Sequence, residues 1–114
     1  MGAIKVKEIN LERGMPFVDE AMNRLVNDLT TGKMAGYKAA VIIHGYGSSG
    51  AGGAIKAATK KKLKDPALRG ILRAVVSGEE WISEKKAFLD VCPQLGDFQR
   101  HIEGNKGITV VLIK

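Results

Sequence analysis

The pattern of apolar and polar positions changes period along the chain, and it predicts strands that alternate with helices. Residues 4–11 and 108–113 carry the β-branched, partly alternating pattern of strands, although the first slips near Lys7. Residues 39–44 form a short apolar run, which is typical of a buried strand, and residues 70–76 predict one more strand.

Apolar residues at helical spacing fill the segments between these strands. A broad stripe follows Pro16, which suits a first helical position, and its members are Phe17, Val18, Ala21, Met22, Leu25, Val26 and Leu29. Residues 53–64 predict a second helix, and residues 79–94 and 97–103 predict a helical insert with Trp81 in its core. We therefore expect an α/β fold: a two-layer sandwich of a mixed four-stranded sheet and helices in the order β-α-β-α-β-β, with the insert before the last strand.

Length and composition bound the class of protein. With 114 residues, 45% hydrophobic and 26% charged, the sequence predicts a single globular domain over residues 1–114, and we expect a monomer. No apolar run reaches the length of a membrane span and the first residues lack a signal-peptide core, so we expect no membrane partner. The single cysteine, Cys92, excludes an internal disulfide and suits a cytoplasmic location.

A glycine-rich loop follows the apolar run of residues 39–44. Residues 45–53 contain five glycines, and a lysine-rich helical pattern comes directly after them. Strand, glycine loop and helix in this order suit phosphate, because glycine allows a close backbone approach and the amides at a helix start point outward as donors. The candidate phosphate-binding residues in this loop are Gly45, Tyr46, Gly47, Ser48, Ser49 and Gly50. Tyr46 could also stack on a base.

Other uses of the loop can be weighed from its spacing. A Walker A loop is excluded, because Gly53 and Ala54 stand where Lys and Ser or Thr are required. Residues 45–50 do match Gly-x-Gly-x-x-Gly, the dinucleotide-binding pattern, for which Asp65 would have to end a second strand. A purely structural turn is the third alternative.

The net charge of +6 is concentrated behind the loop. Residues 56–73 hold seven bases and one acid, whereas the remaining residues hold eleven of each and sum to zero. Lys56, Lys60 and Lys64 share one helix face at i, i+4 spacing. A charge run is often only a solvated helix face, but its position after a phosphate-type loop favours an anionic partner such as DNA or RNA.

The order of these motifs resembles the small MutS-related (Smr) domain family. His44-Gly45-Tyr46-Gly47 is similar to the family's His-Gly-x-Gly motif at a strand end, residues 14–21 to its first turn and helix, residues 55–64 to its basic helix, and residues 107–113 to its closing strand. The resemblance covers most of the chain. It implies a nucleic-acid-binding domain, often with endonuclease activity, whose fold is related to that of the C-terminal domain of bacterial translation initiation factor three.

The resemblance also implies where cleavage would take place. His44 could act as a general acid or base or donate to phosphate, or it could simply hydrogen-bond the loop. Asn10 and Glu12 stand where the family has Asp and His or Arg, so Glu12 is the candidate for a second proton-transfer role, with a surface carboxylate beside Arg13 as the alternative. Arg13 could grip phosphate.

These departures lie at the expected catalytic position, so we expect nucleic-acid binding with, at most, weak DNA or RNA cleavage. No cofactor is evident and no His or Cys cluster has metal-ligand spacing, although cleavage could use a divalent metal. The alternative is a non-catalytic module that docks a partner or binds a nucleotide or phosphate.

Overall fold

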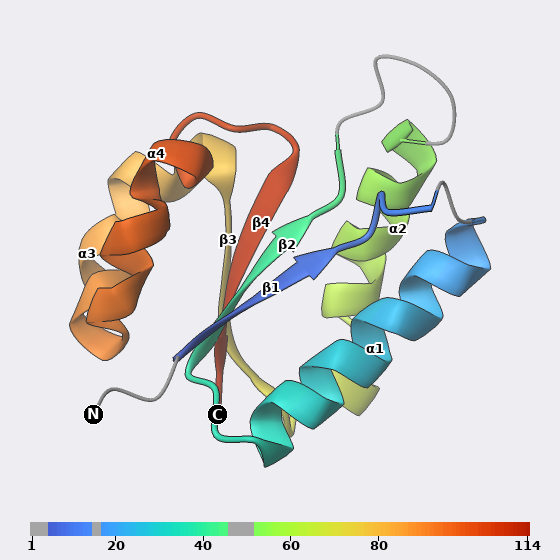
Figure 1. Cartoon of the computed structure of the whole chain (residues 1–114), viewed down its shortest axis with the longest axis horizontal. Coiled ribbons are helices and arrows are strands. Elements are labelled where there is room, and N and C mark those ends of the chain that lie inside the picture. Colours follow the sequence, from blue (N-terminus) through green and yellow to red (C-terminus); the bar gives the residue numbers. More distant parts are fainter. Residues whose placement is uncertain (1–4, 15–16, 46–51) are drawn as a thin grey trace.

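Four strands form one mixed sheet in residues 5–14, 17–45 and 52–114, which are the residues that the computed structural model describes. The strands are β1 (Val6–Asn10), β2 (Ala39–Ile43), β3 (Leu72–Ser77) and β4 (Ile108–Ile113). Their order across the sheet is β1-β2-β4-β3; β1 runs parallel to β2, and β4 runs antiparallel to both β2 and β3. The carboxyl ends of β1 and β2 therefore meet the start of β4 at one edge (Figure 1).

Helices cover both faces of this sheet. On one face lie α1 (Val18–Met34) and α2 (Gly52–Leu63), and on the other lie α3 (Trp81–Val91) and α4 (Gln99–Ile102) (Figure 1). Short 3₁₀ turns connect them, namely η1 (Pro66–Leu68), η2 (Gly78–Glu80) and η3 (Pro93–Phe98). The predicted α/β sandwich with a mixed four-stranded sheet is confirmed, and the helical insert adds a layer opposite α1 and α2.

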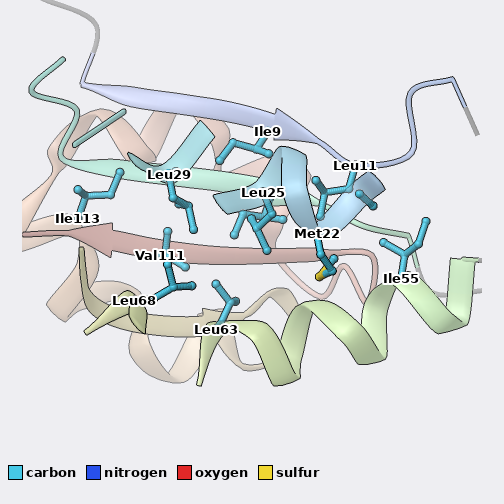
Figure 2. Packing of buried hydrophobic residues seen from close by; sticks show 13 residues of the cluster. Ile9, Leu11, Met22, Leu25, Leu29, Ile55, Leu63, Leu68, Val111 and Ile113 are labelled. Atoms are coloured by element: carbon cyan, nitrogen blue, oxygen red, sulfur yellow. The ribbon is translucent and has the colours of Figure 1, made fainter. Parts of the chain in front are cut away.

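The first hydrophobic core fills the space between the sheet and α1 and α2. Figure 2 shows side chains from β1, α1, α2, η1 and β4 meeting there, among them Ile9, Leu25, Ile55, Leu68 and Val111. The predicted stripe on α1 is confirmed at its central positions, where Ala21, Met22, Leu25 and Leu29 are buried.

Phe17 is a correction to that stripe. It precedes α1 in an extended conformation (φ −66°, ψ 160°), so its side chain does not continue the helical face, and it is 79% exposed. Its backbone amide donates to Glu20 Oε1 at 3.4 Å, an interaction within the first turn of α1. The physical reason for the error is that the helix begins one residue later than the apolar pattern indicates.

The second core lies between the sheet and the helical insert. Trp81 is fully buried, as predicted, and it meets Phe88 edge to face with ring centroids 5.9 Å apart. Because helices cover both faces, all six residues of β4 are buried, which explains why this strand reads as a nearly continuous apolar run.

Candidate nucleic-acid interface

The ends of β1 and β2 place Glu12 beside the start of the glycine loop. Asn10 pairs with Ile43 in the parallel register, and the amide of Leu11 donates to the carbonyl of Ile43 at 2.8 Å. The next residue after Leu11 is Glu12, which lies beyond the end of β1, and its carboxylate lies against the Cα of Gly45. Residues from the two predicted motifs are thus brought together.

Gly45 is enclosed on two sides. Its φ of +71° lies in the left-handed region, and a side chain there would collide with the Glu12 carboxylate. On the side of β4, the amides of His44 and Gly45 both donate to the carbonyl of Gly107, at 2.9 and 3.1 Å. A side chain at Gly107 would lie 3.2 Å from the Cα of Gly45. The left-handed conformation therefore favours glycine at position 45, and a side chain there would also force the exposed Glu12 carboxylate to move.

His44 is a buried histidine with both ring nitrogens engaged. Its Nδ1 lies 2.6 Å from the carbonyl oxygen of Gly45, and its Nε2 lies 2.9 Å from Oγ1 of Thr109 in β4. A carbonyl can only accept, so Nδ1 carries the proton, and Nε2 of the neutral ring accepts from the Thr109 hydroxyl. Burial lowers the pKa of His44 below its ordinary value, the hydrogen bond to the Gly45 carbonyl opposes this in part, and the charges of Lys56 and Lys60 each lower the pKa by a smaller amount.

This geometry decides what His44 can do without rearrangement. The neutral ring ties the end of β2 to β4 and holds the first residue of the loop. To exchange a proton with a substrate, Nε2 must first give up the hydrogen bond from Thr109. The proton-transfer role of His44 therefore stays a prediction, and it requires that opening.

Arg24 of α1 fixes the turn that follows β1. Its Nη1 donates to the carbonyl oxygens of Asn10 and Arg13, at 3.3 and 3.0 Å. The side chain of Asn10 accepts from the amide of Glu12 at 2.9 Å. The turn is held through its backbone, which leaves the side chains of Glu12 and Arg13 exposed at the edge of the sheet.

The predicted lysines differ in their surroundings. Lys56 forms an ion pair with Glu79, with Nζ and Oε1 3.3 Å apart, and its side chain is only 19% exposed. Lys60 is exposed on α2, and Lys64 is exposed one residue beyond the end of that helix. Lys56 and Lys60 lie close enough to His44 to affect its pKa. The remaining predicted loop residues, Tyr46, Gly47, Ser48, Ser49 and Gly50, lie outside the described residues.

Comparison with known proteins agrees with this arrangement. A family model, described as Smr domain, matches residues 13–114. The chain belongs to the Smr domain family. The crystal structure of the Smr domain of Thermus thermophilus MutS2 is similar in fold, with a TM-score of 0.57 and 23% sequence identity over 95% of this chain and 98% of that chain. No match was found among curated proteins.

The family match begins after the strand that departs from the family pattern. Residues 13–114 exclude β1 and the positions of Asn10 and Glu12, whereas the structural similarity extends over 95% of this chain. The fold of this Smr domain is thus retained in the region where its first motif differs in sequence.

The dinucleotide-binding interpretation does not fit this Smr domain. The strand after α2 is β3, which pairs antiparallel with β4 and has no register with β2. Asp65 caps η1, because its Oδ1 accepts from the amide of Ala67 at 2.9 Å. The acidic residue therefore stands in a turn and not at the end of a parallel strand.

Sequence reasoning missed several residues of this site, including Arg24 of α1. Thr109 was detectable as a polar residue in an otherwise apolar buried strand, and Gly107 stands directly before that strand. No motif or spacing in the sequence pointed to Glu79, because only the fold brings the start of the helical insert close to Lys56.

Two features are absent from the described residues. Within them, no three His, Cys, Asp or Glu side chains gather closely enough to hold a metal ion. In the same part of the chain, no helix combines the length and the apolar character that a membrane crossing needs.

Proposed function

We propose that this Smr domain binds nucleic acid through the edge formed by the ends of β1 and β2 and by α2. The observation that carries the proposal is that Glu12 lies against Gly45 while Lys56 and Lys60 lie close enough to His44 to act on its pKa, at the point where the segment that holds the whole net charge begins. Nucleic-acid binding is a general property that the family resemblance implies. Cationic side chains along a helix suit phosphate oxygens.

The electrostatics of this edge support an anionic ligand. Lys56 and Lys60 act on the buried ring of His44 strongly enough to lower its pKa, and that ring is neutral near pH 7. The positive potential here therefore comes from the lysines and not from His44. Phe17 adds an exposed aromatic ring at the turn between β1 and α1, where a base could stack.

A binding titration with charge-reversal variants tests the proposal. Fluorescence anisotropy of labelled single- and double-stranded DNA and RNA is measured for the parent protein and for Lys56→Glu/Lys60→Glu/Lys64→Glu. We expect the triple variant to weaken binding by more than about tenfold at low salt, because each lost phosphate contact also reduces counterion release.

The matched control reverses the same number of charges on the other helical layer. In Lys85→Glu/Lys86→Glu/Arg100→Glu the changes lie on α3 and α4, and we expect a much smaller loss. Equal losses in both triple variants would mean that only overall charge matters. Binding of free nucleotides without any binding of oligonucleotides would support a nucleotide- or phosphate-binding module instead.

We also propose that any phosphodiester cleavage is weak and uses His44 and Glu12. The proposal is supported by the position of the Glu12 carboxylate at Gly45, the residue next to His44. Loss of one such group typically costs about two to four orders of magnitude in rate. Glu12 is exposed, so Glu12→Gln should reduce cleavage of single- and double-stranded substrates, assayed with and without Mg²⁺, while binding is preserved. Undiminished cleavage by this variant contradicts the assignment.

A further inference from the structure

A second surface lies at the far end of α2, away from the loop. It is an open groove of about 350 Å³ between the end of this helix, η1 and the edge strand β3. Its apolar floor consists of Leu63, Leu68, Leu72 and Val75, of which Leu63 and Leu68 also belong to the first core (Figure 2). Its rim carries three cations, Lys64, Arg69 and Arg73.

The groove is positively charged, because Asp65, the acidic residue that lines it, already has a hydrogen-bond partner and an ion-pair partner. Asp65 accepts from the amide of Ala67 through Oδ1, at 2.9 Å, and its Oδ2 lies 3.8 Å from Nζ of Lys62, which does not line the groove. Among the described residues, none forms an ion pair with Lys64, Arg69 or Arg73. The ligand that suits this surface is anionic at one end and apolar at the other.

A row of lysines connects the groove to the proposed interface. Lys56 faces Glu79, just after the carboxyl end of β3, and Lys64 lines the groove beside the beginning of β3. Lys60 lies between them on the same helix face, at i, i+4 spacing. The row therefore follows β3 from Lys56 to Lys64, about 12 Å for eight steps of helical rise.

The edge of β3 does not suit an added peptide strand. Its register with β4 shifts between Leu72 and Ala74, so Arg73 forms a bulge, and Arg73 is exposed. A bulge and a charge on an edge strand both oppose regular pairing with another strand. A nucleotide does not require regular strand pairing. Its phosphate can bind the guanidinium groups, and its base or sugar can pack on the apolar floor.

We propose that this groove is a second nucleotide subsite. It holds the continuation of a single nucleic-acid strand that is bound at the edge formed by the ends of β1 and β2 and by α2, here called the loop edge. The proposal rests on the proposed function. Arg69 and Arg73 contact phosphate, and the floor beside Val75 takes the base or sugar. At a spacing of about 3.4 Å per phosphate, the lysine row corresponds to about four nucleotides.

A length series of single-stranded oligonucleotides tests this subsite. An oligonucleotide of about 2 nucleotides is too short to reach from the loop edge to the groove, and one of about 12 nucleotides is long enough. We expect the parent protein to bind the longer one more tightly, and Arg69→Ala/Arg73→Ala to lose this gain while binding the short one normally. If each arginine contacts one phosphate, the slope of log K against log salt for the long oligonucleotide falls by about 1.4.

Two further variants sharpen the result. Val75→Glu places a carboxylate on the exposed edge of the groove without removing a basic side chain. It should cause the same loss of length dependence. Lys85→Ala/Lys86→Ala removes two charges from α3 and should retain the full gain.

The outcomes separate failure of the groove from failure of the proposed function. If the parent protein binds short and long oligonucleotides equally, or if the groove variants keep the full gain and slope, the subsite is refuted and the loop edge stands. If no oligonucleotide binds at all, the proposed function fails and the subsite fails with it. Binding of a glutamate-rich peptide that the groove variants abolish, with no length dependence for nucleic acid, would assign the groove to a peptide instead.

Discussion

The hydroxyl of Thr109 donates a hydrogen bond to Nε2 of His44, 2.9 Å away, in the interior of the protein. This bond joins the middle of the sheet to the residue that immediately precedes the glycine loop. The histidine of the His-Gly-x-Gly motif therefore has a structural role, because this bond connects it to the neighbouring strand β4. Catalysis by His44 would have to compete with this bond.

Thr109→Val should destabilise the fold by about 1–3 kcal/mol. Valine has nearly the shape of threonine but leaves the buried Nε2 acceptor without its partner, and an unsatisfied buried polar group has a cost of this size. Chemical denaturation of the two proteins measures the difference. Thr109→Ser keeps the hydroxyl and is the control, so equal loss in Thr109→Val and Thr109→Ser would show that the hydrogen bond contributes nothing.

The burial of His44 should make stability depend on pH below neutrality. Burial holds the folded-state pKa below the ordinary value of 6.5, so between these two values the unfolded chain binds more protons than the folded one. The free energy of unfolding then rises with pH across this interval, and the stabilisation by neutral His44 is lost as the pH falls through it.

The measurement is a series of denaturation curves from about pH 7 down to about pH 5, the region in which this difference in protonation acts. His44→Gln should be less stable than the parent protein at pH 7 but should lose less stability over the same range. A decrease of the same size in both proteins would contradict the role of His44.

The change between strand-type and helix-type hydrophobic periodicity along the chain was sufficient to predict the sheet and its helices. Each of these elements buries a regular set of side chains. β4 and α1 follow the predicted boundaries closely, whereas Phe17 does not, since the apolar pattern cannot reveal that the helix starts after it. The extra helical layer was likewise not deducible from local patterns. It depends on the tertiary packing of Trp81 and its neighbours against the far face of the sheet.

The site was predictable only where the chain order itself brings residues together. Parallel pairing of β1 and β2 follows from a strand-helix-strand unit, so the approach of Glu12 to Gly45 could be expected. Glu79 and Thr109 come from segments that follow the loop by tens of residues, and no spacing rule connects them to it. The same limit applies to the groove at β3, which exists only once Arg69 and Arg73 lie beside the end of α2.

Gly45→Ala should destabilise the domain in a way that depends on Glu12. The left-handed φ of +71° alone costs about 1–2 kcal/mol for a residue with a side chain, and the collision with the Glu12 carboxylate adds to it. In the Glu12→Ala background the second contribution disappears, so Gly45→Ala should cost less there. A double-mutant cycle measured by denaturation checks this coupling. Identical costs in both backgrounds would place Glu12 away from Gly45.

Glu79→Gln should strengthen nucleic-acid binding. Glu79 holds Lys56 at 3.3 Å, and a phosphate must compete with this carboxylate for the same ammonium group. Exposed ion pairs are worth about 0.2–1 kcal/mol, so we expect affinity to rise by up to about fivefold at low salt and the increase to shrink at high salt. Anisotropy titrations at several salt concentrations measure both effects. Glu84→Gln on α3 changes the charge equally without touching a lysine of α2, and it should have a smaller effect. If the two variants bind alike, Glu79 acts only through net charge, and the ion pair with Lys56 does not regulate access to the interface.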